Sequence, residues 1–573
     1  MGPVSPPART LPPIEPCTSA AGAALPPVID DFEDARTGGG AWFSYGDHTP
    51  DAVAERKVEA VEGQRALHVT ARGFNDWGAA AGVALGAAAA RATLAAGGTP
   101  ADGCEVDGRV YAGIRFRVRG HGKLRVVVAT TPLISRDEGG GCDLGSGCFD
   151  WPGADVALPG DAWADVTLPF CDLAPAGWGR SRATVDAAHL FAVHFRLGEG
   201  VASDVWLDDV AFLPRAPGAV EPPVCRPVCP LAAVPPAAKA VIDPARLLPR
   251  YADAGLTVHT FEQQTKACGP LTRRYLAYVP KRLPPRAGVP VVMALHGYGA
   301  SAETFLDMQA RNRFQALAER DGYVVVFANA APGAATSAIT PNSGAWRLGH
   351  AEDVDVDDVA YLDRVLDDLR GRDVVGGRNR VFLVGHSLGG GMILAAARRQ
   401  PARYAGLAAL MPFAGWTPRP PAAARGEPPP LLLMWSATDP GVPPGYSPVL
   451  RRLAGDWATT AGVAVPDLTA PRRASLPDRV NEGASYAGAL PAALASRGSQ
   501  GEQLDWIVRE AGGGPAGRVA VRAVIFDRAG HFLPTTVEQD DAWALPKWGF
   551  RNHDVDAADL AWTFFRETLG AAP

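Results

Sequence analysis

Hydrophobic and polar residues alternate over many short runs in the N-terminal part of the chain, and Gly, Pro and Asp interrupt these runs. A period of two is typical of strands that bury one face. Many short strands with little helical periodicity predict an all-β sandwich or jelly roll, which we place at 28–215. The runs that carry the pattern are 65–70, 111–118, 123–130, 162–169, 190–197 and 205–212.

The pattern changes beyond residue 265, where apolar runs alternate with helical segments. Apolar residues at 356, 359, 362, 365, 366 and 369 have the spacing of a helix that buries one face. This alternation predicts a parallel sheet with helices on both faces, and hence an α/β domain at 265–573. The predicted strands are 271–279, 289–295, 323–328, 380–384, 407–411, 431–435 and 519–526, and the predicted helices are 303–320, 356–369, 392–399, 447–461 and 556–569.

Proline-rich stretches flank the sandwich. A chain of 573 residues is too long for one ordinary domain. Residues 1–27 form a Pro-rich N-terminal segment, and residues 216–264 form a linker that contains Pro and Cys. We expect this linker to be semi-rigid, because it contains Pro222-Pro223 and Pro235-Pro236.

The predicted strand at 380–384 ends in Gly385-His386-Ser387-Leu388-Gly389, and a helical segment follows at once. A G-x-S-x-G motif between a strand and a helix predicts a serine held on a sharp, strained turn with its hydroxyl exposed. The flanking glycines allow two backbone segments to approach closely. The motif in this context predicts the α/β-hydrolase fold, with Ser387 as nucleophile.

The partners of Ser387 should follow it in the order acid, then histidine. Of the two later histidines, His531 comes just after the strand at 519–526, whereas His553 precedes the final helix and suits a surface or capping role. Asp439 follows the apolar run 431–435 and is the predicted acid, which would orient His531 and stabilise its cation. The alternative acids, which follow no comparable apolar run, are Asp467, Asp478 and Asp505.

A tetrahedral intermediate also needs amide donors. One should be the Leu388 N–H, at the start of the helix after the nucleophile. The second should be the Tyr298 N–H, in the loop after the strand at 289–295. We expect His296, Trp346, His386 and Trp435 to line the substrate pocket, with a hydrogen bond to the loop as the alternative for His296 and core packing as the alternative for Trp346.

Charge and cysteine content bear on partners and compartment. A net charge of −6 and a pI near 6.0 give no indication of a basic surface that binds nucleic acid. No apolar run in the sequence is a good candidate for a membrane span. An even number of cysteines, 8, in loop-like surroundings favours disulfides and an exported protein over reduced thiols or zinc, although no signal peptide is visible in this chain. Cys142 and Cys148 could close a small loop, and Cys225 or Cys229 could join the linker to Cys17 or Cys268.

The motifs of residues 265–573 together resemble the esterase family that includes poly(3-hydroxybutyrate) depolymerases, feruloyl esterases and acetylxylan esterases. The resemblance implies a secreted serine esterase with Ser387, Asp439 and His531 as its triad. This chain departs from the family at Trp435-Ser436, where His-Gly is frequent, and at Phe532-Leu533-Pro534, where Trp-Pro-Gly is frequent. The residues that carry the resemblance are Leu295-His296-Gly297-Tyr298-Gly299, Gly344-Ala345-Trp346, Asp355-Val356-Asp357-Asp358-Val359-Ala360-Tyr361-Leu362, Gly385-His386-Ser387-Leu388-Gly389-Gly390, Ala437-Thr438-Asp439 and Gly530-His531.

The stretch between Asp439 and His531 is long and contains a Pro-, Gly- and Ser-rich portion at 466–501, which could be a lid or substrate loop.

The N-terminal region resembles the galactose-binding-like β-sandwich modules of secreted carbohydrate-active enzymes, through Asp30-Asp31-Phe32-Glu33-Asp34, Trp77-Gly78 and Trp206-Leu207-Asp208-Asp209-Val210. The resemblance implies a carbohydrate-binding module and a structural Ca²⁺ on Asp31, Glu33 and Asp209, with solvated strand ends as the alternative. The aromatic candidates for stacking on sugar, with core packing as the alternative, are Trp42, Tyr45, Trp77 and Trp178.

These observations predict a secreted serine carboxylic-ester hydrolase that acts on polymer-linked esters, namely feruloyl or acetyl esters of plant polysaccharide. The alternatives are a polyhydroxybutyrate depolymerase, a peptidase or lipase on the same fold, and, in another class, a non-catalytic carbohydrate-binding protein. We expect a monomer that requires no cofactor, binds a polysaccharide or polyester, and binds neither nucleic acid nor membrane.

Overall fold

The structure is a computed structural model that describes residues 12–17, 27–33, 41–47, 49, 51–74, 77–85, 104–142, 148–176, 184–198, 200–215, 255–265, 269–283, 288–306, 313–331, 344–348, 356–375, 380–413, 420–422, 426–442, 446–476, 501–509, 517–527, 529–536, 548–549 and 551–570. The described residues up to Arg215 belong to one compact unit, and those from Gly255 onward belong to a second. Each unit is described by itself.

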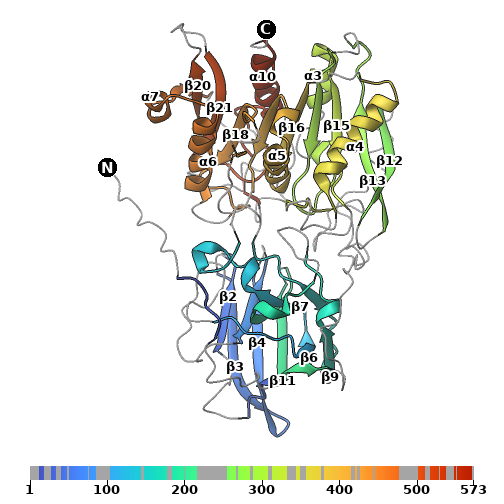
Figure 1. The fold of residues 1–573 in the computed structure, drawn as a ribbon, viewed down its shortest axis with the longest axis vertical. Coiled ribbons are helices and arrows are strands. Elements are labelled where there is room, and N and C mark those ends of the chain that lie inside the picture. The colour runs from blue at the N-terminus through green and yellow to red at the C-terminus, as the bar shows by residue number, and fades with distance from the viewer. Residues whose placement is uncertain are drawn as a thin grey trace, which may run out of the picture. The chain divides into compact units, whose positions relative to one another are not determined.

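The first unit contains two antiparallel sheets (Figure 1). One has the strand order β3-β4-β11-β6-β9, with β1 also paired to β11, and the other has the order β2-β5-β10-β7-β8. The strands are β1 Val28–Asp30, β2 Ala41–Gly46, β3 Val53–Val61, β4 Gln64–Arg72, β5 Ala79–Ala84, β6 Tyr111–His121, β7 Leu124–Thr130, β8 Gly153–Val156, β9 Gly160–Pro169, β10 Leu190–Leu197 and β11 Ser203–Pro214.

One hydrophobic core joins the two sheets. Leu67 and Val69 of β4 and Val205 of β11 alternate with more exposed residues, and their buried side chains belong to the same cluster as Val126 of β7 and Val193 of β10 in the other sheet. Two sheets that share one buried layer form a β-sandwich. The β-rich architecture predicted for this region is therefore present.

Disulfides reinforce this unit, in part against expectation. Cys142 pairs with Cys148, as predicted. Cys17 pairs with Cys104, and not with the linker, because residues 15–17 form a short bridge beside Glu105, in which the Cys17 N–H donates to the Glu105 carbonyl at 2.8 Å. Cys171 is also disulfide-bonded, and Cys225, Cys229 and Cys268 lie outside the described residues.

The second unit is built on a ten-stranded sheet of order β12-β13-β15-β14-β16-β17-β18-β21-β20-β19. The six strands from β15 to β21 in this order are parallel, and antiparallel strands extend both edges. The strands are β12 Leu256–Gln264, β13 Pro270–Tyr278, β14 Val291–Leu295, β15 Val324–Ala328, β16 Val381–His386, β17 Gly406–Leu410, β18 Leu431–Ser436, β19 Arg472–Ser475, β20 Gly501–Arg509 and β21 Gly517–Phe526. The helices are α2 Ala302–Thr304, α3 Arg313–Asp321, α4 Asp358–Gly371, α5 Leu388–Arg399, α6 Tyr446–Thr460, α7 Val465–Thr469 and α10 Ala557–Gly570.

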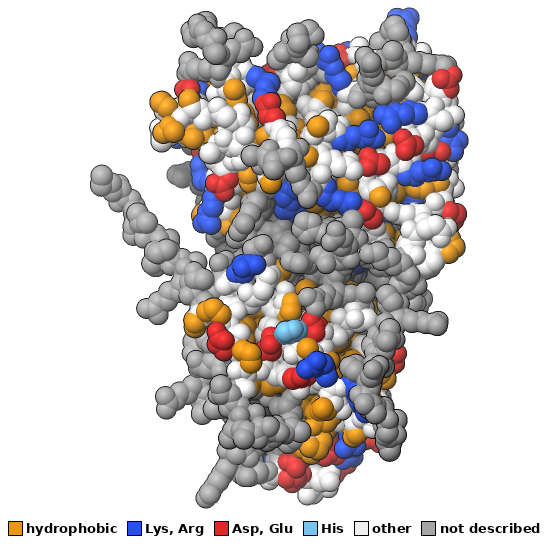
Figure 2. All heavy atoms as spheres, in the orientation of Figure 1, with side chains coloured by type: hydrophobic (Ala, Val, Ile, Leu, Met, Phe, Trp, Pro, Cys, Tyr) orange, Lys and Arg blue, Asp and Glu red, His pale blue; other side chains and the backbone are white. Residues whose placement is uncertain are grey.

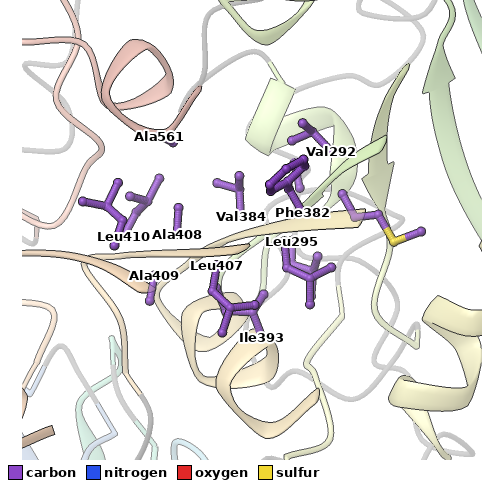
Figure 3. Packing of buried hydrophobic residues seen from close by; sticks show 14 of the residues in the cluster. Val292, Leu295, Phe382, Val384, Ile393, Leu407, Ala408, Ala409, Leu410 and Ala561 are labelled. Atoms are coloured by element: carbon purple, nitrogen blue, oxygen red, sulfur yellow. The ribbon is translucent and has the colours of Figure 1, made fainter. Parts of the chain in front are cut away.

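Helices cover both faces of this sheet (Figure 3). Val384 and Ala408 point toward Ala561 of α10, whereas Leu407 and its neighbours on the opposite face point toward Ile393 of α5. Because both faces are covered, the five parallel strands β14 to β18 are buried over their whole length. This burial explains why the central strands are continuous apolar runs in the sequence.

Three sequence-based boundaries change. The predicted helix at 303–320 is represented by α2 and α3, and residues 307–312 lie outside the described residues. The last part of the predicted linker is strand β12, which pairs with β13 along its full length. Within the proposed lid at 466–501, the described part contains most of α7 and all of β19, which adds to the sheet edge beside β20.

The exposed surface mixes positive and negative side chains over the face shown in Figure 2. No helix in the described parts of the chain is long and apolar enough to span a membrane.

Candidate active site

Ser387 lies on a sharp turn between β16 and α5. Its backbone has φ 54° and ψ −120°, a conformation that costs energy for a residue with a side chain. Two glycines make the turn possible: a Cβ on Gly385 would lie 2.1 Å from the Gly389 carbonyl oxygen, and a Cβ on Gly389 would lie 2.3 Å from that of Leu295. The turn therefore has the strand–turn–helix geometry that presents a nucleophilic serine.

His531 and Asp439 form a buried pair at the ends of neighbouring parallel strands. Asp439 follows β18 and His531 follows β21, and the two strands are hydrogen-bonded. Nδ1 of His531 lies 3.0 and 2.9 Å from the two Asp439 carboxylate oxygens. The Gly441 N–H also donates to Asp439 Oδ1 at 2.7 Å and holds the carboxylate in place. Asp439 can thus orient the imidazole with its other nitrogen, Nε2, turned away from the carboxylate.

A hydrogen bond from the residue before the nucleophile holds His531 beside it. His386 Nε2 donates to the His531 carbonyl at 2.7 Å, and the two imidazole centroids are 5.0 Å apart. Ser387 is 9% exposed, which leaves it reachable at the carboxyl edge of the sheet. The structure therefore brings Ser387, His531 and Asp439 to one place.

The loop at 296–300 reaches the nucleophile. A Cβ on Gly297 would lie 3.1 Å from Ser387 Cβ and 3.6 Å from Ser387 Oγ, so a side chain here would crowd the serine, whereas glycine leaves it in place. Tyr298 follows in the same turn, and Leu388 is the first residue of α5. Amides at a helix N-terminus carry partial positive charge, which suits a developing oxyanion.

His296 and Trp346 lie behind this loop, which corrects their prediction as pocket residues. Both are fully buried. His296 Nδ1 donates to the Gly297 carbonyl at 2.7 Å, and its Nε2 accepts from the Ala330 N–H at 3.1 Å. Burial lowers the pKa of His296 to about 4, so the ring is neutral near pH 7. His296 thus has the hydrogen bond to the loop, and Trp346 has the core packing, that were considered as their alternatives.

His386 and Trp435 are likewise buried and hydrogen-bonded within the domain, and their place in the substrate pocket stays a prediction. His386 is 5% exposed; burial, followed by the nearby His531, lowers its pKa well below the ordinary value. The Trp435 indole N–H donates to Ser447 Oγ of α6 at 2.8 Å. Both rings support the site from within the core.

The residues considered as alternatives to His531 and Asp439 form other contacts or lie elsewhere in the chain. His553 Nδ1 bonds to the Thr535 carbonyl at 2.7 Å. Asp505 forms ion pairs with Arg522 and Arg472. Asp467 is in α7, and Asp478 lies outside the described residues.

Two residues beside His531 were not found by sequence reasoning. Gly441 lies against the imidazole, since a Cβ there would be 2.2 Å from His531 Cγ. The Trp548 ring stacks on His531 at 5.4 Å, and the Trp548 carbonyl accepts the His531 N–H at 2.7 Å. The only local signal was the glycine two residues after the predicted acid.

The sandwich does not assemble the predicted calcium site. Glu33 accepts the Arg65 N–H at 2.9 Å, Asp31 accepts the Glu33 N–H at 3.3 Å, and Asp209 lies 3.8 Å from Arg117. Among the residues that the structure describes, no group of three His, Cys, Asp or Glu side chains could hold a metal ion. The three carboxylates therefore behave as capping and ion-pairing groups at strand ends.

The aromatic side chains considered for sugar stacking differ in exposure. Trp42 donates to Asp30 at 2.7 Å, and the Tyr45 hydroxyl bonds to His194 Nδ1 at 2.6 Å, so both are tied to the sheet. Trp77 is 43% exposed and its ring centroid is 5.7 Å from that of Tyr45. Trp178 lies outside the described residues.

Comparisons with known proteins find esterases and α/β-hydrolases. A putative esterase, NocK of Nocardia uniformis subsp. tsuyamanensis, is 31% identical over 154 residues, which is 27% of this chain and 41% of the relative. The matched stretch thus spans about two fifths of the relative's length.

Solved structures with local likeness include an acetyl xylan esterase from Aspergillus awamori and a family 11 carbohydrate-binding module of the cellulosomal cellulase Lic26A-Cel5E of Clostridium thermocellum. The first is 12% identical and covers 50% of this chain and 97% of its own, with a TM-score of 0.32. The second is 16% identical and covers 34% of this chain and 97% of its own, with a TM-score of 0.23. At TM-scores this low, neither likeness decides fold or activity.

The family model described as "Alpha/beta hydrolase family" matches residues 291–544, the stretch that contains Ser387, Asp439 and His531. The C-terminal part of the chain is therefore an α/β-hydrolase domain.

Proposed function

We propose that the protein is a secreted serine carboxylic-ester hydrolase that acts on polymer-linked esters. The observation that carries the proposal is the convergence of a strained Ser387, a carboxylate-bound His531 and a glycine loop on one edge of the sheet. A serine held in this way can attack an acyl carbon, provided that a base takes its proton.

The reaction proceeds through an acyl-enzyme. His531 accepts the Ser387 proton as Oγ attacks the ester carbonyl, and Asp439 stabilises the imidazolium. The N–H groups of Tyr298 and Leu388 stabilise the oxyanion. His531 then protonates the leaving alcohol, and water activated by His531 releases the acid from Ser387. This chemistry needs no metal or organic cofactor.

The substrate class we favour is a feruloyl or acetyl ester of plant polysaccharide. The sandwich that precedes the hydrolase domain exposes Trp77 beside Tyr45, and aromatic rings of this kind can stack on sugars. A module that binds the polymer raises the local concentration of its esters. Polyhydroxybutyrate is the competing polymer, with the sandwich then binding polyester.

An exported protein is consistent with the disulfides of the sandwich, since such bonds persist in oxidising compartments. A carbohydrate-binding protein with an inactive hydrolase domain is the alternative of another class. The intact Asp439–His531 pair beside a strained serine disfavours it, because this strain serves no purpose without chemistry.

The test compares wild type with Ser387→Ala on methyl ferulate, acetylated xylan and amorphous polyhydroxybutyrate. We expect ferulate or acetate release by the wild type and a loss of at least about 10³-fold in the variant, with polymer binding retained. Thr459→Ala, which removes a hydroxyl at an exposed position on α6, is the matched control and should keep full activity. Undiminished turnover by Ser387→Ala would refute the proposal, and release of hydroxybutyrate alone would replace the substrate class by a polyester.

A further inference from the structure

One short segment, 344–348, holds the loop that carries the proposed oxyanion donor. The Gly299 N–H donates to the Gly344 carbonyl at 3.1 Å, and the Gly344 N–H donates to the Ala300 carbonyl at 3.0 Å. Two residues further on, the Trp346 indole N–H donates to the His296 carbonyl at 2.8 Å. The segment therefore forms hydrogen bonds with the loop on both sides of Gly297 and Tyr298.

Trp346 reaches the loop from the protein interior. Its side chain is fully buried, and its ring centroid is 5.2 Å from that of His296. The carbonyl that it binds belongs to the peptide between His296 and Gly297, and the next peptide carries the Tyr298 N–H. A fixed orientation of the first peptide limits the rotation of the second, because only two backbone dihedrals separate them.

A buried ion pair anchors Trp346 in turn. The N–H of the next residue, Arg347, donates to Asp358 Oδ2 at 2.8 Å. Asp358 Oδ1 is 2.7 Å from Nη2 of Arg273, and both of these side chains have no exposed surface. Arg273 also lies over the Tyr361 ring at 3.8 Å. The segment is thus tied to β13 and to the first turn of α4, both of which are parts of the rigid core.

We propose that Trp346 is a positioning residue for the oxyanion hole: its indole N–H orients the loop at 296–300 so that the Tyr298 amide faces the oxyanion. The inference rests on the proposed ester hydrolysis at Ser387. Oxyanion donors act at about 2.7–3.1 Å, and misplacement by about 1 Å can cost about 100-fold in rate. A residue that never touches substrate can therefore change kcat through the loop.

The test is Trp346→Phe, which keeps an aromatic ring and removes the N–H. The matched control is Trp457→Phe: Trp457 is also fully buried and donates its indole N–H to a backbone carbonyl, that of Pro429 at 2.9 Å, but it lies in α6. With p-nitrophenyl acetate we expect Trp346→Phe to lower kcat about 10- to 100-fold with KM changed less than about twofold. Affinity for a trifluoromethyl ketone that forms a tetrahedral adduct should fall by a similar factor, and Trp457→Phe should change neither quantity.

The outcomes separate this inference from the proposed function. Labelling of wild-type Ser387 by a fluorophosphonate and ester turnover are measured first, and failure of both would remove the proposed function together with the inference. Where the wild type is active, a kcat for Trp346→Phe equal to that of Trp457→Phe would overturn the inference alone. If Trp346→Phe fails to fold, benzothienylalanine at position 346, which keeps the bicyclic ring and lacks the N–H, provides the same test.

Discussion

Replacing Gly441 by alanine should disable the proposed site without touching any residue of the triad. A Cβ at this position would lie 2.2 Å from Cγ, 2.3 Å from Nδ1 and 2.6 Å from Cδ2 of His531. Ordinary carbon contacts lie at about 3.5–4.0 Å, so the imidazole or the turn at 439–441 must move by more than about 1 Å. The ring cannot simply slide away, because Trp548 stacks on it and His386 holds its backbone.

The magnitude follows from this displacement. A misplacement of about 1 Å in a catalytic group costs about 100-fold in rate, equivalent to about 2.7 kcal/mol of activation free energy. We therefore expect kcat of Gly441→Ala for p-nitrophenyl acetate to fall about 100-fold, measured at saturating substrate. The loss should appear in kcat, because the change acts on the base and not on a binding surface.

Gly455→Ala is the control. Gly455 lies within α6, and a Cβ there has nothing within 4 Å. Alanine should leave kcat unchanged and stabilise the helix by about 0.5–1 kcal/mol. If Gly441→Ala remains folded and retains kcat within about twofold of the wild type, displacing the His531 imidazole does not slow the reaction. The assignment of His531 as the base would then be wrong.

Two further predictions concern stability. The His296 pKa of about 4 lies below the unfolded value of 6.5, so between these pH values the unfolded chain binds more protons. His296 should therefore contribute a fall of roughly 3 kcal/mol in the free energy of unfolding of the hydrolase domain as pH drops from about 6.5 to 4. His386, whose pKa is also lowered, adds to the total in the same direction, so His296→Gln should reduce the slope in urea titrations without abolishing it, and an equal slope in the variant would contradict the assignment. In the sandwich, the Cys17–Cys104 bridge spans 87 residues and the Cys142–Cys148 bridge spans 6. Loop-closure entropy then predicts losses of about 4–5 and about 2 kcal/mol when each pair is replaced by serine, and the reverse order in thermal unfolding would argue against it.

The parts of the site that lie at strand ends could be predicted from the sequence. The carboxyl ends of parallel strands meet at one edge of the sheet, so Ser387 after β16, Asp439 after β18 and His531 after β21 could be placed together before any coordinates existed. The central parallel strands were recognisable because their burial leaves almost no polar interruption in the sequence.

Other features depend on contacts between residues distant in the chain. Strand β12 was assigned to the linker because its exposed edge position leaves it largely polar. Asp357 and Asp358 stood out as a pair, but their partners, Arg399 and Arg273, are set only by the fold. Cysteine pairing is similarly underdetermined, since 8 cysteines allow 105 arrangements.

The backbone conformation of Ser387 makes the residue that is best for stability different from the residue that is needed for reactivity. Its φ of 54° with ψ of −120° is a conformation that glycine adopts at little cost and that a serine adopts at a cost of about 1–3 kcal/mol. The most stable residue at this position is therefore one that cannot attack an ester. Stability alone would favour glycine at this position, so the serine is a residue that the proposed chemistry requires and the fold does not.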